Sequence, residues 1–313
     1  MLPSPVQVSF IIPLFNCLAL TRACVESLAA TLPPGLAHEI VLVDDGSTDG
    51  TREWLATLRA PFRVTLNERN LGYALANNRG GALATGNLLL LLNNDLVLPP
   101  GWLEPMLAAL ADPRMRAGIV GNVQLDARTG ATDHAGIVLT AQGKPEHARA
   151  LPSFAWRRSA RVRRVPAVTG ACLLIERALW KQLGGFDHGF VNGGEDVDLC
   201  YRARAAGRNT VVALDSVVRH HVSSSFGRKL RDEQNSFRLA RRWRKEFIRD
   251  ATQAWCRAYL QGAWVDPQSR EHRLARHALR HAAGLTVIPP PEAITGLEAA
   301  QAREFARWDT LFG

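Results

Sequence analysis

Four short polar segments of this 313-residue chain carry residue types whose spacing suits chemistry. They combine carboxylates, amides and imidazoles, the side chains that bind divalent cations, accept hydrogen bonds from hydroxyls or transfer protons. Each segment follows an apolar run or a glycine-rich stretch, which would place it at the end of a secondary-structure element. The four segments are Asp44–Ser47, Asn93–Asp95, Glu195–Asp198 and His220–His221.

The first segment is Asp44-Asp45-Gly46-Ser47, directly after an apolar run. Carboxylates at a strand end accept hydrogen bonds from a nucleobase N–H or from ribose hydroxyls, and Gly46 permits a tight turn. The structural alternative stays open, because Ser47 or Asp49 would cap the next helix equally well. Spacing alone favours the cap.

The second segment, Asn93-Asn94-Asp95, follows five consecutive leucines. A buried strand would therefore deliver the Asp95 carboxylate to the edge of a sheet. Mg²⁺ and Mn²⁺ prefer oxygen ligands and are commonly shared between one or two carboxylates and substrate phosphates. The alternative is an ordinary turn, in which Asn and Asp are frequent.

The third segment, Glu195-Asp196-Val197-Asp198, opens a predicted helix after a glycine pair. A carboxylate within hydrogen-bond reach of a hydroxyl can act as a general base. Acidic residues in the first turn also stabilise the helix dipole, so both interpretations predict acids here.

The fourth segment is the pair His220-His221, which follows a predicted short strand. An imidazole binds Mn²⁺ as well as zinc and could complete a coordination sphere begun by Asp95. A pair of surface histidines is the alternative.

The elements that must position these residues alternate between short apolar strands and amphipathic helices. This order predicts an α/β fold with a mostly parallel sheet flanked by helices. Ligands bind beyond the carboxyl ends of such strands, where the polar segments fall. The predicted strands of the first half are Val8–Ile12, Glu39–Val43, Phe62–Leu66 and Leu88–Leu92, and the predicted helices are Leu18–Ala30, Arg52–Leu58 and Tyr73–Ala84.

The second half begins with a turn-rich stretch over 121–165 and returns to regular elements near residue 168. From about residue 226 the pattern is helical and is interrupted by Pro289-Pro290-Pro291. We therefore expect a domain over 1–225 and a helical extension over 226–313. The predicted elements are strands Val168–Ile175, Thr210–Leu214 and Ser216–Val218, and helices Arg177–Leu183, Glu195–Ala206 and Thr295–Trp308.

The composition is basic, with 38 Lys and Arg against 29 Asp and Glu and a formal charge of +9. This excess attracts phosphate on a nucleic acid, an anionic lipid or a small substrate. Solvated surface faces are the plain alternative for both basic clusters. The clusters are Arg157, Arg158, Arg161, Arg163 and Arg164, and then Arg228, Lys229, Arg231, Arg238, Arg241, Arg242, Arg244, Lys245 and Arg249.

Five scattered cysteines without a C-x-x-C pair argue against a zinc knuckle or a disulfide framework and fit a reducing compartment. The first residues do not resemble a secretory signal, and the longest apolar run is too short to cross a bilayer. We expect a cytoplasmic protein, with peripheral contact at the inner face of a membrane allowed.

Taken together, the segments over roughly residues 8–225 resemble family 2 glycosyltransferases of the GT-A fold. Many pieces occur in the same order, so the resemblance does not depend on one motif. The matching pieces are Val8–Pro13, Glu39–Gly50, Asn70–Tyr73, Asn77–Gly80, Gly86–Asn87, Leu92–Asp95, Thr169–Ala171, Gly184–Asp187 and Glu195–Gly207.

The resemblance implies roles for individual residues. Asp44 and Asp45 match acids that meet the nucleoside, and Asp95 matches the metal ligand of a D-x-D motif. Asp196 matches the catalytic base, with Glu195 as its neighbour in a Glu-Asp pair. The rest of the implied set comprises donor-binding Pro13, Asn70, Gly72, Asn78, Asn93 and Asn94 (Asn94 near the ribose) and His220 as a second metal ligand, for which His221 is a rival.

Two residues depart from the family pattern. Asn93 replaces the first acid of the D-x-D motif, which leaves less negative charge for a metal. Asn77 stands where relatives frequently have an arginine, which weakens any inference about the nucleobase. The Asn-Asn-Asp form is similar to the bacterial rhamnosyltransferase and O-antigen branch.

The activity implied by the resemblance is inverting transfer of a sugar to a hydroxyl acceptor with Mn²⁺ or Mg²⁺. The donor would be a UDP-, dTDP- or GDP-linked sugar, and the acceptor a saccharide or lipid-linked saccharide. The cation would stabilise the leaving diphosphate, and Asp196 would deprotonate the acceptor. We expect the basic C-terminal helices to lie near anionic lipid or a lipid-diphosphate acceptor.

Two other classes of protein are alternatives to a glycosyltransferase. A sugar-nucleotide nucleotidyltransferase would carry a glycine-rich basic loop after the first strand, where this chain has Pro13-Leu14-Phe15-Asn16. A catalytically silent binding module, including a nucleic-acid binder, would rely on the basic runs with Trp243 and Phe247. These form only a weak stacking pattern, so we expect no nucleic-acid partner.

Overall fold

The computed structural model describes residues 7–151, 161–221, 231–265 and 271–312, and these residues form two compact units. The first unit comprises the chain up to Ile137 together with His147–Arg231. The second comprises Val138–Glu146 and the chain from Asp232 onward. The boundary predicted between residues 225 and 226 lies outside the described residues, as do Arg157, Arg158, Arg228 and Lys229.

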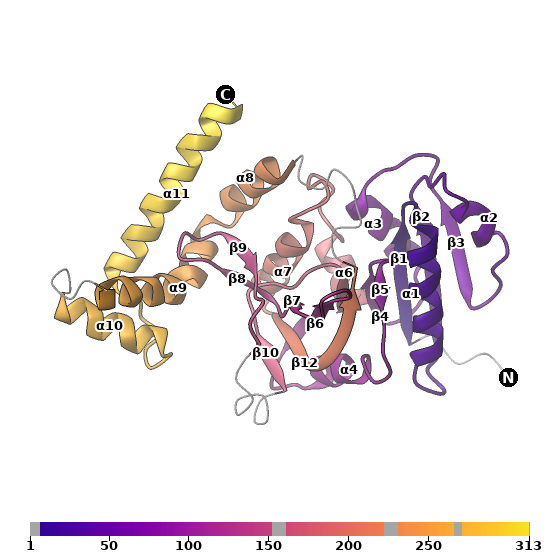
Figure 1. Ribbon diagram of the computed structural model, residues 1–313, viewed down its shortest axis with the longest axis horizontal. Coiled ribbons are helices and arrows are strands. Elements are labelled where there is room, and N and C mark those ends of the chain that lie inside the picture. Colours follow the sequence, from indigo (N-terminus) through magenta and orange to yellow (C-terminus); the bar gives the residue numbers. More distant parts are fainter. Residues whose placement is uncertain (1–6, 152–160, 222–230, 266–270, 313) are drawn as a thin grey trace. The chain divides into compact units, whose positions relative to one another are not determined.

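The first unit is built on one mixed sheet with the strand order β10-β12-β6-β11-β4-β1-β2-β3 (Figure 1). Strand β5 pairs with β12, and β7 pairs with β6. The strands are β1 (Val8–Leu14), β2 (His38–Asp44), β3 (Phe62–Leu66), β4 (Leu88–Leu92), β5 (Leu96–Val97), β6 (Ala117–Asp126), β7 (Thr132–His134), β10 (Val162–Arg164), β11 (Cys172–Glu176) and β12 (Asn209–His220).

The first four strands of this sheet pair only in parallel with one another, as the alternation of elements predicts. Strand β1 is parallel to both β2 and β4, β2 is parallel to β3, and β12 is parallel to β6. Strand β11 runs antiparallel to both β4 and β6, so its first residue lies at the edge where the parallel strands end. The loop before β11 is thereby brought to the same edge as the loop after β4.

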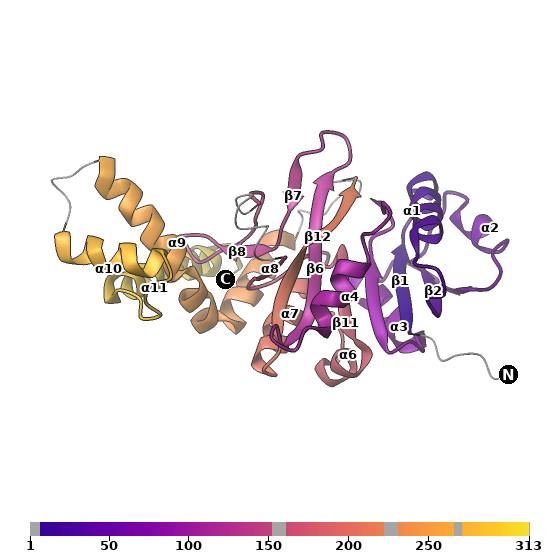
Figure 2. The same cartoon turned by 90° about the horizontal axis from the view of Figure 1, so that it is seen from below.

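Helices cover both faces of this sheet. On one face, alternate residues of β1 such as Phe10 and Ile12 share a core with Cys24 and Leu28 of α1. On the other face, Gly80 of α3 packs so closely that a Cβ would lie 2.4 Å from Cγ2 of Ile11. Figure 2 shows α1 and α3 on opposite sides of β1. The helices of the unit are α1 (Leu18–Thr31), α2 (Thr51–Leu55), α3 (Tyr73–Leu83), α4 (Glu104–Ala111), α6 (Arg177–Leu183) and α7 (Glu195–Ala205).

The second unit contains helices α8 (Asp232–Arg242), α9 (Arg244–Val265), α10 (His272–Ala282) and α11 (Pro291–Phe312). The hairpin of β8 (Ile137–Leu139) and β9 (Pro145–His147) contributes Val138–Glu146 to this unit. A small core of Cys256, Ala278 and Ala293 joins three of the helices. No helix in the described part of the chain is both long and apolar enough to span a membrane.

Several predicted elements differ in extent from the structure. The strand expected over Val168–Ile175 starts only at Cys172, and the helix expected over Arg52–Leu58 spans Thr51–Leu55. The two short strands expected over Thr210–Leu214 and Ser216–Val218 are one strand, β12, whose pairing with β6 shifts register between Ala213 and Val217. The last helix, expected over Thr295–Trp308, starts at Pro291 and continues to Phe312. Proline is favoured at a first helical position, so the last residue of the proline triplet begins this helix.

Candidate functional site

The predicted site residues meet at the carboxyl edge of the sheet in the first unit. Leu14, the last residue of β1, pairs with Asp44, the last residue of β2. Asn93 follows β4, and its backbone N–H donates to the carbonyl of Ala171 before β11 at 2.8 Å. His220, at the end of β12, pairs with Leu96 directly after Asp95. Segments far apart in the sequence thus share one edge.

The carboxylate of Asp45 ties two loops together at this edge. Its Oδ1 accepts from Asn67 Nδ2 at 2.6 Å and from the Leu71 N–H at 2.9 Å, and its Oδ2 accepts from the Gly72 N–H at 2.9 Å. Asp44 is fully buried and accepts from Arg52 Nε at 2.8 Å. Both acids therefore shape the loops of the predicted donor site, and their contact with a nucleoside stays a prediction.

The helix-capping alternative for this segment is not found, because the N-cap residue of α2 is Gly50 and no described side chain caps it. Asp49 lies one residue before Gly50 and bonds to neighbouring residues. Its Oδ1 accepts from the N–H and hydroxyl of Thr51, at 3.2 and 2.6 Å, and its Oδ2 accepts from the Leu18 N–H at 2.9 Å. Burial raises the pKa of Asp49, but these hydrogen bonds outweigh that effect and lower it. Ser47 accepts from the Asn16 N–H instead of capping the helix.

The other predicted donor-binding residues line the same edge or support it. Asn70 and Gly72 belong to the loop held by Asp45, and the backbone of Asn70 packs on Gly46, where a Cβ would lie 2.7 Å from the Asn70 nitrogen. Pro13 is partly buried in β1 and pairs with Val43. Asn78 bonds through both ends of its amide to the backbone of Phe186, at 2.8 Å each, which favours a structural role.

Three acids begin α7, and the structure gives each a different environment. Glu195 is buried and accepts from the Gly193 N–H at 2.8 Å. Asp198 is fully buried and forms an ion pair with Arg202 at 2.7 Å. Asp196 is only partly buried, and its Oδ2 accepts from the Gly170 N–H at 3.0 Å. Asp196 is therefore the acid of the three best placed to reach a substrate.

Residues Thr169–Ala171 connect Asp196 to the Asn-Asn-Asp segment. Besides the Gly170 N–H bond to Asp196, the Gly170 carbonyl accepts from the Tyr73 hydroxyl at 2.8 Å. A Cβ at residue 170 would lie 2.9 Å from that hydroxyl oxygen, so the close approach requires glycine. Tyr73 and Gly170 both lie in segments that match the family, but their contact spans 97 positions, so the sequence alone gives neither residue a role.

Asp95 and His220 form the second centre of the edge. Both side chains are largely buried, and His220 Nε2 lies 3.3 Å from Asp95 Oδ1. On the other side of the ring, Nδ1 lies 3.8 Å from Oδ2 of Asp133 in β7. The side chain of His221 is exposed, and its backbone N–H donates to the Asp95 carbonyl at 3.0 Å. This geometry favours His220 over His221 as a ligand.

The carboxylates of Asp133 and Asp95 change the pKa of His220. Burial lowers the pKa of His220, but the carboxylates of Asp133 and Asp95 more than reverse this effect and raise it to about 9. The contact with His220 in turn lowers the pKa of Asp133. A cation bound at Asp95 would replace the proton of His220 as the positive charge at this centre.

The residues at this centre fit a divalent cation shared with a substrate. Asn93 Oδ1, Asp95 Oδ1 and His220 Nδ1 are buried and make no hydrogen bond of normal geometry within the described part of the chain. Asp95 Oδ1 and His220 Nδ1 have the charged contacts given above. In the same part of the chain, no three His, Cys, Asp or Glu side chains form a ready metal site. The protein would thus supply Asp95 and His220, and donor phosphates would supply further oxygens.

Two residues near this centre were missed by the sequence analysis. Asp133 sits in a three-residue strand within the turn-rich stretch, where periodicity offers no signal. The neighbouring His134 is fully buried, and its ring lies 4.8 Å from that of His147. Burial lowers the pKa of His134 well below its ordinary value, so its ring is neutral.

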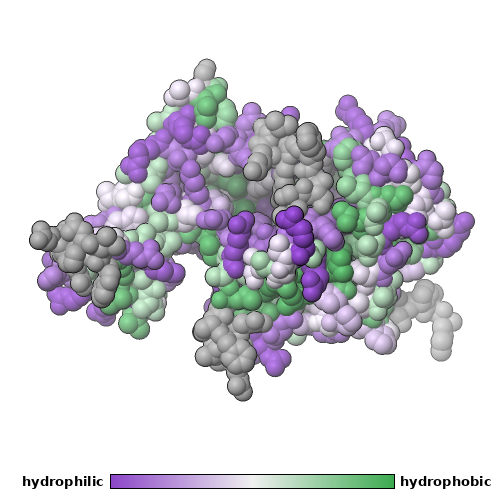
Figure 3. All heavy atoms as spheres, viewed as in Figure 1, coloured by the Kyte–Doolittle hydropathy of each residue, from purple (hydrophilic) through white to green (hydrophobic). Residues whose placement is uncertain are grey.

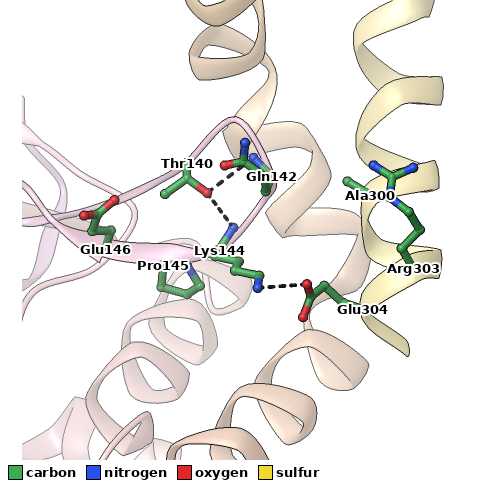
Figure 4. A pocket seen from close by; sticks show the side chains of 8 residues that line it. All are labelled: Thr140, Gln142, Lys144, Pro145, Glu146, Ala300, Arg303 and Glu304. Carbon is green, nitrogen blue, oxygen red and sulfur yellow. Dashed lines mark hydrogen bonds and ion pairs between the residues drawn. The ribbon is translucent and has the colours of Figure 1, made fainter. Parts of the chain in front are cut away.

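A cavity of about 520 Å³ lies elsewhere, in the second unit (Figure 4). It contains none of the predicted site residues. Lys144 of the hairpin and Glu304 of α11 form an ion pair of 3.0 Å at this cavity, so their charges are neutralised. Its lining residues are Thr140, Gln142, Lys144, Pro145, Glu146, Ala300, Arg303 and Glu304.

Comparison with known proteins identifies the family of this chain. Residues 9–175 match the family model described as glycosyl transferase family 2. The chain is 34% identical over 230 residues to O-antigen biosynthesis protein RfbC of Myxococcus xanthus, which covers 70% of this chain but 18% of that protein. It is 28% identical over 271 residues to N-acetylglucosaminyl-diphospho-decaprenol L-rhamnosyltransferase of Mycobacterium tuberculosis, covering 77% and 84% of the two chains.

A solved structure is similar over nearly the whole chain. The mannosyltransferase PcManGT of Pyrobaculum calidifontis, in complex with GDP-Man and Mn²⁺, superposes with a TM-score of 0.56 and 20% identity. The match covers 98% of this chain and 88% of that one. This likeness confirms the predicted GT-A fold class.

Proposed function

This chain belongs to glycosyl transferase family 2, and from that membership we propose that it moves a sugar from a nucleoside-diphosphate donor to a hydroxyl acceptor with inversion. The observation that carries the proposal is the shared edge of the sheet. Asp196 and the Asn93–Asp95 segment are linked there through the three residues Thr169–Ala171. A base and a cation-binding carboxylate at the same edge of the sheet suit in-line displacement.

In this proposal Asp196 takes the proton of the acceptor hydroxyl. The Gly170 N–H, 3.0 Å from Oδ2, holds the carboxylate in place, and the Tyr73 hydroxyl holds Gly170. Val197 N–H donates to Oδ1 at 2.8 Å. Because both oxygens are oriented by backbone donors, little reorganisation is needed when the acceptor binds. Glu195 supports the preceding glycine loop through its bond to Gly193.

Asp95 and His220 would hold Mn²⁺ or Mg²⁺, with Asp133 orienting the His220 ring from its far side. When bound, such a cation stabilises negative charge on a leaving diphosphate as a Lewis acid. The replacement of an acid by Asn93 makes the site less negative, so donor phosphates contribute more of the charge that attracts the metal. A carboxylate that contacts the second ring nitrogen of a histidine ligand, as Asp133 contacts that of His220, commonly fixes the orientation of the ring.

The donor and acceptor follow from the relatives as proposals. The Mycobacterium relative is named as a rhamnosyltransferase acting on an N-acetylglucosaminyl-diphospho-decaprenol, and the solved mannosyltransferase holds GDP-Man. We propose a UDP-, dTDP- or GDP-linked sugar as donor and a saccharide or lipid-linked saccharide as acceptor. A lipid-linked acceptor would bring the chain to the inner face of a membrane.

A product assay tests the proposed reaction. With Mn²⁺, a nucleotide sugar and a saccharide acceptor, release of nucleoside diphosphate in step with glycoside formation is expected. Release of pyrophosphate would instead identify a nucleotidyltransferase, and binding without turnover of any UDP-, dTDP- or GDP-sugar would identify a silent module. A thermal-shift screen of the three donor classes with and without Mn²⁺ selects the substrate, because a ligand that binds only the folded state raises the Tm.

A further inference from the structure

We propose that the second unit docks onto an anionic lipid bilayer through α10 and the loop that follows it. Four aliphatic side chains are largely exposed here, and we call them the apolar patch: Leu279 (59%), Leu285 (72%), Val287 (92%) and Ile288 (67%). Figure 3 shows hydrophobic, green surface over this end of the unit. Exposed apolar patches with a polar rim mark interaction surfaces.

The loop that carries the patch is held against α10. The Leu285 N–H donates to the Arg280 carbonyl at 2.8 Å, and His277 Nε2 donates to the Ile288 carbonyl at 3.0 Å. His281 Nδ1 donates to the Thr286 carbonyl at 3.1 Å, and its Nε2 lies 2.9 Å from the Thr252 hydroxyl of α9. Because the loop is already ordered, binding costs little conformational entropy.

The backbone of this loop also suits the edge of a bilayer. Unsatisfied N–H and C=O groups are costly in lipid. The amides of Gly284, Leu285 and Ile288 donate within the unit, and the carbonyls of Thr286 and Ile288 accept. The residues Pro289–Pro291 have no N–H to satisfy. The exposed side chains can therefore enter the bilayer interface while these backbone N–H and C=O groups keep their hydrogen bonds.

The charge beside the patch selects an anionic surface. Arg273, Arg276 and Arg280 lie three and four positions apart on α10, and all three are exposed. The chain has no acidic residue from His272 to Pro290. Within the described part of the chain, none of the three arginines forms an ion pair. A second copy docking by the same face would oppose these charges with themselves, whereas lipid phosphates neutralise them.

Vesicle flotation of the full chain tests the proposal. Binding is expected to phosphatidylcholine vesicles that contain phosphatidylglycerol, to be weaker on phosphatidylcholine alone, and to fall as salt is raised. Each arginine near an anionic surface favours binding about fivefold, so R273Q/R276Q/R280Q should lose at least roughly tenfold in affinity. L285S/V287S/I288S should lose at least that factor on both vesicle types, because each buried CH₂ contributes about fourfold.

Matched controls lie in the first unit. V64S/L66S removes exposed aliphatic side chains from β3, and R22Q/R59Q/R128Q removes three exposed arginines. Both should bind like the unaltered chain. Equal losses in controls and test variants, or no binding to either vesicle, would overturn the proposal, as would concentration-dependent dimerisation abolished by the patch variant. The assay needs neither donor nor acceptor, so its failure would leave the proposed transfer reaction untouched.

Discussion

At the scale of single residues, three neighbouring acids of α7 that the sequence alone does not distinguish differ in burial and in bonding. Glu195 and Asp198 are buried in bonds to the protein, whereas Asp196 is partly exposed and oriented by Gly170. Only a carboxylate that can reach solvent can meet an acceptor hydroxyl. Burial therefore supports the role that the family resemblance implies for Asp196.

The first prediction concerns the proposed base. Asp196→Asn should lower kcat about 10²–10⁴-fold, because an amide cannot take the acceptor proton. Donor binding, measured by titration calorimetry, should be unchanged within about twofold, because the contact to the Gly170 N–H survives in the amide oxygen. Asp215→Asn, an exposed acid on β12, is the control. A kcat within a few-fold of the unaltered chain would remove Asp196 from this role.

The second prediction concerns the carboxylate behind His220. Asp133→Asn should weaken Mn²⁺ binding about 10–100-fold, because the ring loses the partner that orients it. The measurement is a Mn²⁺ titration followed by electron paramagnetic resonance in the presence of a nucleoside diphosphate. The Tm of the variant without metal should equal that of the unaltered chain, because a lower Tm would indicate general destabilisation and not loss of ring orientation. An unaltered Mn²⁺ affinity in this variant, with Asp95→Ala losing binding, would show that Asp133 does not position His220.

At the scale of elements, one buried carboxylate joins the starts of three strands. Glu39 of β2 accepts from Ser9 of β1 at 2.6 Å, from the Thr85 N–H before β4 at 2.6 Å and from Arg63 of β3 at 3.1 Å. Burial raises the pKa of Glu39, but these hydrogen bonds outweigh it and lower the pKa to about 2. The strand starts opposite the site thus depend on an ionised Glu39.

A third prediction follows for the pH dependence of stability. With a folded pKa of about 2 against an ordinary 4.5, ionised Glu39 contributes roughly 3 kcal/mol that is present above pH 4.5 and lost as pH falls toward 2. Urea unfolding should show Glu39→Gln destabilised most near neutral pH, with the difference shrinking in acid. Glu53→Gln, an exposed control, should track the unaltered chain. A difference that does not change with pH would contradict this account.

At the scale of the whole molecule, the proposed transfer site and the proposed lipid-binding surface lie in different units. The polar edge uses residues of the first unit only, and the apolar patch uses residues of the second. The alternative of a nucleic-acid binder loses support, since Phe247 is almost fully buried and cannot stack on a base. The exposed apolar patch and arginines of the C-terminal unit fit the proposed lipid surface better than a nucleic-acid site.

A fourth prediction is that these two functions vary independently. L285S/V287S/I288S should keep the kcat of transfer to a water-soluble acceptor within about twofold, and Asp196→Asn should float with vesicles like the unaltered chain. Sites without shared residues show nearly additive effects. The combined variant should show both defects at their single-variant sizes. A transfer defect with the soluble acceptor in the patch variant would show that the functions are coupled.

The sequence by itself was enough to predict the α/β fold, the positions of the first four strands along the chain and the polar residues at the strand ends. These features are local, because apolar runs, turn residues and helical spacing are encoded within about ten neighbouring positions. The family resemblance added the implied roles of Asp95 and Asp196. The family and the fold are confirmed, whereas the residue roles stay predictions.

Only the tertiary structure decided which candidates lie together. Three contacts of the site join residues that are far apart in the sequence, and no local pattern encodes them. Asp133 contacts His220 across 87 positions, Tyr73 contacts Gly170 across 97, and His220 contacts Asp95 across 125. The single strand β12 likewise depends on its partner β6 to continue through an irregularity. Exposure of the apolar patch is also a tertiary property. From the sequence alone these aliphatic residues would be predicted to lie in the core, and only the structure shows that they are exposed.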